Sequence, residues 1–326
     1  MNLHEVAQKF KTTVNPKTLF GDNPEVIYRE LAAVIHPDLY DGEDKELAKE
    51  TFKKLEELKA KLNAPIAEIS TKENIYRFWE LLGNNGVSDI YRATTENPSK
   101  ELINLLCFVS DDRDLMKNDE EFTKTIRGNS FGITDFFPDL HSSFSIKQAG
   151  SPIRYCNAYY VINDLYSAAQ IKAKYPNGLE DRHLVWMFKR LLSALAVAHN
   201  NGIVYGGSTP DNIYFHAKNH GIVLFNWTTA VKAGNNIPYY VEKWQNFYPA
   251  EVLNKQKVKP DFDIYMAAKL MLWLSSNLDR RIKVFFEACI SGKSESRRQD
   301  AWELLEDFKK LSQRVFGPNK YVKLVM

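Results

Sequence analysis

Cysteine is scarce in this chain, and the few cysteines are scattered. Three occur among 326 residues, at Cys107, Cys156 and Cys289, without the spacing of metal ligands. An odd, sparse set argues against a disulfide framework and is typical of a reducing compartment. Each cysteine stands among apolar residues, which predicts buried and inert thiols. We therefore expect a cytoplasmic protein.

The sequence also lacks a long apolar run and an excess of charge of either sign. Its most apolar stretch, Met266 to Leu274, is too short to span a bilayer and contains Lys269. The amino terminus carries charges where a signal peptide needs an apolar segment. Lys and Arg number 43 against 41 Asp and Glu, and no five like charges follow one another. We expect protein partners, and neither nucleic acid nor a membrane.

Two amphipathic helices are predicted after a lead-in over residues 1–15. The first begins near Pro24 and has one apolar face, built from Ile27, Leu31, Val34 and Ile35. Pro37 ends this helix because proline disfavours the α conformation of the residue before it. After a polar loop over residues 39–44, the second helix runs to about residue 62 with the apolar face Ala48, Phe52, Leu55, Leu58 and Leu62. We assign residues 16–63 to this hairpin and 64–73 to a linker.

The loop of the hairpin contains the tripeptide His36-Pro37-Asp38. Within the text YRELAAVIHPDLYDGEDKELAKETFKKLEELKAKL, the region resembles the J domain of DnaJ-type co-chaperones. The resemblance implies docking to a DnaK-class chaperone, with Asp38 pairing with an arginine of its ATPase and accelerating ATP hydrolysis. The helix before the tripeptide is typically basic in J domains, whereas here Arg29 stands against two glutamates. The alternative is a hairpin that serves as a scaffold or docking surface for the rest of the chain.

A strand-rich stretch over residues 74–163 precedes a helical one over residues 164–326. In the second, the text WMFKRLLSALAVAHNNGIVYGGSTPDNIYFH resembles the catalytic-loop region of eukaryotic-type protein kinases. His199 and Asn212 match that pattern, but the catalytic aspartate falls on Gly207 and the neighbouring lysine on Thr209. Glycine cannot accept a proton, and the loss of such a base costs ~10²–10⁴ in rate.

The other kinase motifs that carry chemistry are also altered. The metal-binding aspartate of the D-F-G motif maps onto Asn226, a poor ligand for Mg²⁺. The phosphate-pairing lysine maps onto Leu106, and Glu120 or Glu121 is the candidate for its glutamate partner. LLGNNGVSDIYRA resembles the glycine-rich loop, with Gly83 in place but the second and third glycines replaced by Asn85 and Ser88.

Features that a kinase uses for structure are mostly retained. Tyr248-Pro249-Ala250-Glu251 resembles the A-P-E region, and the resemblance implies a buried salt bridge from Glu251 to Arg297 or Arg298. Asp263 resembles the aspartate that tethers the catalytic loop, and we interpret His199 as a core histidine. The expected fold is therefore α+β, with a small helical J-like domain followed by a bilobed kinase-like domain. Its strand-rich small lobe covers residues 74–163 and its helical large lobe residues 164–326.

Three hypotheses follow from these features. The first is a catalytically inactive pseudokinase that acts as a protein-binding adaptor linked to a DnaK-class chaperone, with no cofactor and weak or no binding of ATP and Mg²⁺. The second is an atypical ATP-dependent kinase or phosphotransferase with relocated carboxylates, for which Asp211, Asp164 and Glu242 are the candidates. The third is a specialised co-chaperone whose kinase-like part binds cargo. We also expect Phe225 and Trp227 to pack into the cleft.

Overall fold

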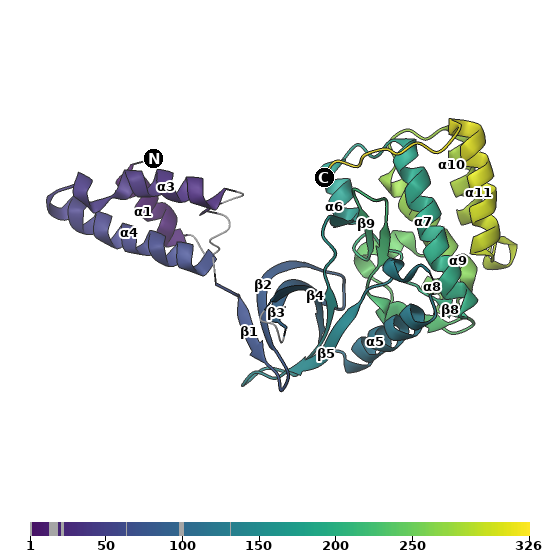
Figure 1. Cartoon of the computed structure of the whole chain (residues 1–326), viewed down its shortest axis with the longest axis horizontal. Helices are drawn as coiled ribbons and strands as arrows, with labels where there is room; N and C mark the ends of the chain where they lie inside the picture. The colour runs from purple at the N-terminus through teal and green to yellow at the C-terminus, as the bar shows by residue number, and fades with distance from the viewer. Residues whose placement is uncertain (1, 13–18, 21–22, 63, 98–100, 131) are drawn as a thin grey trace. The chain divides into compact units, whose positions relative to one another are not determined.

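The computed structural model describes residues 2–12, 19–20, 23–62, 64–97, 101–130 and 132–326. These residues form two compact units (Figure 1). The first comprises Met1–Glu68 with Arg77–Glu80, and the second comprises Ile69–Tyr76 with Leu81–Met326. Helices and antiparallel strands occur together, so the predicted α+β class is confirmed.

The first unit is mainly helical. Its elements are α1 (Leu3–Thr12), α3 (Pro24–Ile35), the 3₁₀ turn η1 (Pro37–Leu39) and α4 (Gly42–Leu62). A single apolar core joins them, because each helix places residues at spacings of three and four on one buried face. Helix α1 contributes Leu3, Val6 and Phe10 to this core. The segment 1–15 is therefore a packed helix over residues 3–12 and more than a lead-in.

Two boundaries of the first unit differ from those we expected. Helix α4 already begins at Gly42, whose φ of +61° suits glycine, so the polar loop is shorter than residues 39–44. Strand β1 (Ala67–Ser70) lies within the segment predicted as a linker, residues 64–73. Its residues alternate in burial, which is the pattern of a strand with one covered face. Segment 64–73 is thus partly regular structure.

A curled antiparallel sheet dominates the first half of the second unit (Figure 1). Strand β3 (Asp89–Glu96) pairs with β4 (Leu102–Ser110), β4 with β6 (Arg154–Tyr160), and β6 with β5 (Leu140–Ile146). Strand β2 (Ile75–Asn84) precedes them, and helix α5 (Arg113–Gly128) and the turn η2 (Thr134–Phe136) lie between β4 and β5. All of these strands lie within residues 74–163, the stretch that we expected to be rich in strands.

Helices dominate the rest of the second unit. The long ones are α7 (Asp181–Asn200), α9 (Pro260–Leu274), α10 (Arg280–Ile290) and α11 (Ala301–Phe316), and the short ones are α6 (Ala168–Lys174) and α8 (Ala250–Leu253). Short strands and turns join them: β7 (Leu165–Ser167), β8 (Ile203–Val204), β9 (Ile213–His216), β10 (Ile222–Leu224), η3 (Trp227–Thr229), β11 (Val231–Lys232), η4 (Glu242–Phe247) and η5 (Ser294–Ser296).

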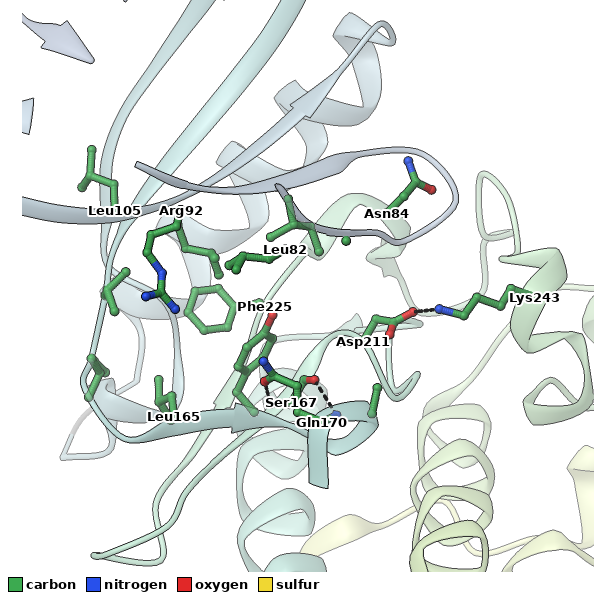
Figure 2. Close-up of a pocket in the computed structure, with 17 residues that line it drawn as sticks. Leu82, Asn84, Arg92, Leu105, Leu165, Ser167, Gln170, Asp211, Phe225 and Lys243 are labelled. Atoms are coloured by element: carbon green, nitrogen blue, oxygen red, sulfur yellow. Dashed lines mark hydrogen bonds and ion pairs between the residues drawn. The ribbon is translucent and has the colours of Figure 1, made fainter. Parts of the chain in front are cut away.

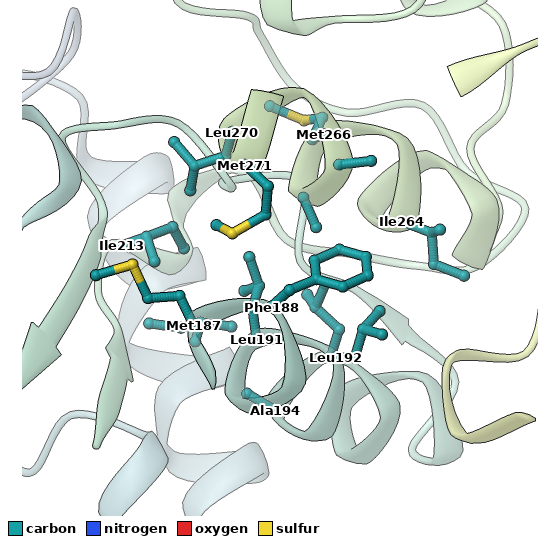
Figure 3. Close-up of a cluster of buried hydrophobic side chains, with 14 of the residues drawn as sticks. Met187, Phe188, Leu191, Leu192, Ala194, Ile213, Ile264, Met266, Leu270 and Met271 are labelled. Atoms are coloured by element: carbon teal, nitrogen blue, oxygen red, sulfur yellow. The ribbon is translucent and has the colours of Figure 1, made fainter. Parts of the chain in front are cut away.

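Helix α7 forms the centre of the helical core (Figure 3). Eleven of its residues are buried, so it is covered on most of its circumference. Its apolar stripe packs against α9, which contributes Met266, Leu270 and Met271. On another side of α7, the ring of Phe188 packs against the rings of Phe286 and Phe308, with centroid distances of 4.8 and 4.9 Å. This packing fixes the loop that follows α7, which carries Gly207, Thr209 and Asn212 of the predicted site.

Candidate functional site

A cavity of about 240 Å³ lies between the curled sheet and the segments that follow it (Figure 2). Its walls are the ends of β2, β3 and β4, the segment before β7, the start of α6 and the region around β9 and β10. Aliphatic and aromatic side chains provide most of the lining: Leu82, Ile90, Leu105, Leu106, Val161, Ile162, Leu165, Tyr214 and Phe225. The cavity includes Gly83 and Leu106 of the predicted site.

Three charged residues line this cavity. Asp211 Oδ2 accepts a hydrogen bond from Lys243 Nζ at 3.0 Å (Figure 2). The same oxygen accepts a hydrogen bond from Trp244 Nε1 at 2.7 Å. Arg92 faces Leu106 across the β3–β4 ladder, so a cation lies beside the position where the lysine was expected. The other two carboxylates of the enzyme hypothesis are not part of the lining. Asp164 pairs with Lys218 at 2.8 Å, and Glu242 is exposed.

In the turn between β2 and β3, side-chain amide oxygens accept hydrogen bonds from the backbone N–H groups of the same turn. Asn85 Oδ1 accepts the N–H groups of Val87 at 3.2 Å and Ser88 at 2.8 Å. Asn84 Oδ1 accepts the N–H of Gly86 at 2.7 Å. Three consecutive backbone donors are therefore satisfied by neighbouring side chains, and both Asn85 and Ser88 are buried. A loop that cradles a phosphate needs such N–H groups directed at the anion.

The position of the expected catalytic base is occupied by an aromatic ring. A Cβ atom added to Gly207 would lie 2.8 Å from Cζ of Tyr205. That ring is fully buried, and its centroid lies 4.7 Å from the centroid of the Trp227 ring. Its hydroxyl donates to the carbonyl oxygen of Phe225. Thr209 is also fully buried, where the neighbouring lysine was expected. Glycine at 207 is thus a requirement of packing.

The two predicted asparagines lie together and bond to neutral groups. Asn226 Nδ2 donates to Asn212 Oδ1 at 3.3 Å, and Asn226 Oδ1 accepts from Thr228 Oγ1 at 2.7 Å. Asn212 Nδ2 donates to the carbonyl oxygen of Gly207 at 3.3 Å. Asn212 and Asn226 are both buried, and none of these contacts involves a charged group. The pair therefore offers amide groups that already have partners.

The two aromatic residues beside Asn226 take opposite directions. Phe225 lines the cavity, as we expected. Trp227 does not, because the left-handed conformation of Asn226, with φ of +60°, turns the following residue away. Its ring packs against Tyr205 and Phe137, and its Nε1 donates to the carbonyl oxygen of Leu224 at 2.9 Å. The expectation that Trp227 fills the cleft is therefore wrong.

Asp263 holds the start of the loop that follows α7. Its Oδ2 accepts the N–H of Tyr205 at 2.8 Å, and its Oδ1 accepts the N–H of Gly206 at 2.8 Å. His199 Nε2 lies 2.9 Å from the same carboxylate. Asp263 is fully buried, so these contacts replace the water that a carboxylate requires. The loop is consequently fixed in place although it carries no acidic side chain at position 207.

Helix α5 contributes a buried carboxylate that the sequence did not single out. Asp119 accepts hydrogen bonds from Trp227 N at 2.6 Å, from Asn157 Nδ2 at 2.7 Å and from the Tyr159 hydroxyl. Burial raises the pKa of Asp119 above its ordinary value, although these donors oppose the shift. The expected residue, Glu120, pairs instead with Lys124 one turn further along α5. Asp119 thus ties α5 to the segment after Asn226.

A buried ion cluster surrounds Arg297. Its guanidinium contacts Glu251 of α8 and lies 3.1 Å from Asp261 of α9. The side chain of Arg297 is 1% exposed, whereas that of Arg298 is 47% exposed and pairs with Asp307 at 3.1 Å. Of the two arginines considered, Arg297 therefore lies beside Glu251.

In the first unit, the tripeptide His36-Pro37-Asp38 forms the turn η1 and its cap. His36 Nδ1 accepts the N–H of Asp38 at 3.3 Å, and the imidazole packs edge-on against Phe52 at 5.5 Å. The side chains of His36 and Asp38 are 49% and 84% exposed. Arg29 is exposed on α3. The turn therefore presents an imidazole and a carboxylate to solvent from a backbone fixed by proline.

Two features are absent from the part of the chain that the structure describes. Within residues 2–12, 19–20, 23–62, 64–97, 101–130 and 132–326, no cluster of His, Cys, Asp or Glu could hold a metal ion. Across the same described residues, none of the helices combines the length and apolarity needed to cross a membrane. No protein-family model matches the chain, and no curated protein matches it.

Proposed function

We propose that this chain is a pseudokinase: a non-catalytic, kinase-like protein-binding module, preceded by a J-like domain that links it to a DnaK-class chaperone. In this proposal, the curled sheet and α5 correspond to a small lobe, and the helices around α7 and α9 to a large lobe. The adaptor role follows because the module keeps a cavity and a stable scaffold but lacks the groups that perform phosphoryl transfer.

The observation that carries the proposal is the packing of Tyr205 against Gly207. In an active kinase, this position needs a carboxylate within hydrogen-bond reach of the substrate hydroxyl. Here an aromatic ring takes up the volume of that carboxylate, and Asn212 and Asn226 bond to each other at the position expected for metal ligands. The side chains around the replaced catalytic positions have therefore repacked, which favours the inactive pseudokinase over an enzyme with relocated catalytic residues.

The state of the β2–β3 turn further supports weak nucleotide binding. Because the N–H groups of residues 86–88 donate to Asn84 and Asn85, an incoming phosphate would compete with bonds that already exist. Asp211 cannot readily replace a metal ligand, since Lys243 and Trp244 share one of its oxygens. Mg²⁺ would have to displace this ammonium to bind.

Because Asp211 is already paired with Lys243, we expect Mg²⁺ to add nothing to the effect of ATP on thermal stability. Adding ~5 mM Mg²⁺ to protein with ~1 mM ATP should change Tm by less than about 1 °C, because only a metal bound together with nucleotide would stabilise the folded state. Differential scanning fluorimetry measures this, with ATP alone as the reference. A magnesium-dependent rise of several degrees that Asn226→Ala abolishes would contradict the proposal.

The chaperone link depends on the exposed tripeptide of the first unit. His36 and Asp38 extend into solvent from a rigid turn, so their recognition would cost little ordering entropy. The charge of α3 is a departure from the J-domain pattern, because Arg29 stands against Glu25 and Glu30. Glu25, however, pairs with Lys59 of α4 at 3.3 Å, which offsets part of the negative charge on this face.

We accordingly expect the protein to accelerate the ATPase of its DnaK-class partner. His36→Gln should return the steady-state ATPase rate to the basal value, because the imidazole caps η1 and contacts Phe52 beside the exposed Asp38. The matched control is His4→Gln, a substitution of another exposed histidine of the same unit, which should leave stimulation unchanged. If the unsubstituted protein stimulates no DnaK-class chaperone of its host, the co-chaperone part of the proposal is lost.

A further inference from the structure

A second cavity, of about 430 Å³, lies in the helical part of the second unit. Helix α7 forms one wall and α11 another, and the segment 316–321 after α11 forms the third. The cavity shares no lining residue with the one beneath the curled sheet. It is therefore a separate place for a ligand, and nothing in the proposed function uses it.

The lining of this cavity is strongly basic. It contains five cationic side chains and no Asp or Glu: Arg182, Lys189, Arg190, Lys309 and Lys320. The whole chain has a net charge of only +2, so this concentration is local. Burial and the nearby Lys309 lower the pKa of Lys189. Like charges held this close repel each other, and an anion between them would remove that cost.

Most of these cations bond to neutral oxygens. Arg182 donates to the carbonyl oxygen of Phe316 at 3.2 Å, and Lys189 to Asn319 Oδ1 at 3.3 Å. Arg190 donates through Nε to the carbonyl oxygen of His220 at 3.0 Å, and its guanidinium lies over the Phe136 ring, 5.8 Å from the centroid. Lys309 donates a hydrogen bond to Glu306 at 2.7 Å, a carboxylate that is not part of the cavity lining. The positive charge of the cavity is thus largely uncompensated.

The third wall is held in place by a stack of three rings. The indole of Trp186 lies parallel to the imidazole of His220, with centroids 4.1 Å apart, and His220 stacks on Tyr321 at 4.6 Å. His220 Nε2 lies 2.6 Å from the carbonyl oxygen of Val322, and the Tyr321 hydroxyl donates to that of Lys218 at 2.9 Å. The segment after α11 is fixed by these contacts, so the cavity exists before a ligand arrives.

We propose that this cavity binds a small molecule that carries two or more phosphate groups. Its volume is in the range of small-molecule sites, and its cations come from opposite walls and converge on one space. Guanidinium groups match phosphate with two parallel hydrogen bonds, and lysine ammoniums supply point charges beside them. Five cations around one half-open cavity suit several phosphates on one molecule, whereas a nucleic-acid strand would require a basic stripe running along the surface.

Inorganic tripolyphosphate tests this proposal, with titration calorimetry in the absence of Mg²⁺ as the measurement. We expect one site per chain, weakened by added salt. Lys189→Gln with Lys309→Gln should reduce affinity at least tenfold, and Lys320→Gln, at an exposed position that carries no packing, about two- to fivefold. The control, Lys283→Gln with Lys293→Gln, makes the same change of charge at exposed positions outside the cavity and should bind as the unsubstituted protein does.

The absence of tripolyphosphate binding would overturn the proposal, as would an equal loss in the control variant, because binding would then follow total charge and not this cavity. Binding of a short single-stranded oligonucleotide without any binding of tripolyphosphate would overturn it too. Such phosphate groups can belong to a lipid headgroup or to a soluble molecule, and vesicles that contain a polyphosphorylated lipid distinguish these two sources. Co-sedimentation that tripolyphosphate reverses identifies a lipid headgroup, and tripolyphosphate binding without co-sedimentation identifies a soluble molecule.

Discussion

Restoring the expected catalytic aspartate with Gly207→Asp should destabilise the second unit by about 3–5 kcal/mol and should not produce phosphoryl transfer. The new Cβ would lie 2.8 Å from Cζ of Tyr205, in a ring that is fully buried. The ring cannot simply rotate away, because its hydroxyl donates to the carbonyl oxygen of Phe225 and its face packs against Trp227.

Charge adds to this steric cost. Three backbone N–H groups near position 207 are already committed, since Tyr205 and Gly206 donate to Asp263 and Thr209 donates to the carbonyl oxygen of Gly207. A carboxylate at position 207 would therefore be buried without a cationic partner among these neighbours, and such a group is costly even when its geometry is good.

Urea unfolding followed by tryptophan fluorescence measures the loss, since Trp227 is fully buried beside the altered site. The matched control is Gly128→Asp at the end of α5, where an added Cβ meets nothing within 4 Å. That variant should remain within about 0.5 kcal/mol of the unsubstituted protein. A Gly207→Asp protein of unchanged stability that hydrolyses ATP in the presence of Mg²⁺ would contradict both the packing argument and the proposed pseudokinase.

Local patterns were sufficient to predict two helices of the first unit. The face that includes Leu31 and Ile35 predicted α3, and the face that includes Ala48 and Leu55 predicted α4. Such periodicity is a property of a few consecutive turns, so it can be read without knowledge of the rest of the fold. The boundaries were less accurate, because Gly42 and strand β1 depend on contacts with other segments.

Asp119 was missed although a signal for it exists. Met116, Thr123 and Ile126 are buried on one face of α5, and their spacing of seven and three residues places position 119 on the same face. In the sequence, Asp119 stands between Asn118 and Glu120 and has the character of a solvated charge. The resemblance to protein kinases suggested Glu120, whereas helical periodicity would have identified the buried neighbour.

The two cavities could not be predicted for a different reason. Residues that meet in the basic cavity, such as Arg182, Lys309 and Lys320, are up to 138 positions apart, and none belongs to a run of three or more like charges. The requirement for glycine at position 207 likewise depends on where the Tyr205 ring lies. Both features depend on tertiary packing, which brings together side chains that no local pattern relates.

The other large expected effect is a loss of stability on replacing the buried Arg297. Arg297→Met should destabilise the second unit by about 3–5 kcal/mol, because it removes the only cation of the described residues that contacts both Glu251 and Asp261. Asp261 is 1% exposed, and burial already raises the pKa of its carboxyl group despite the nearby guanidinium. Without Arg297, this carboxylate would stay buried without an opposite charge.

Arg298→Met is the matched control for this effect, since it makes the same chemical change one position further along. Arg298 is half exposed and pairs with Asp307 and Glu303 on the surface, so its removal should cost less than about 1 kcal/mol. Urea unfolding of both variants under identical conditions gives the comparison. Equal losses from the two substitutions would mean that the buried ion cluster contributes no more than a surface pair, and α8 would then need another contact to hold it against α9.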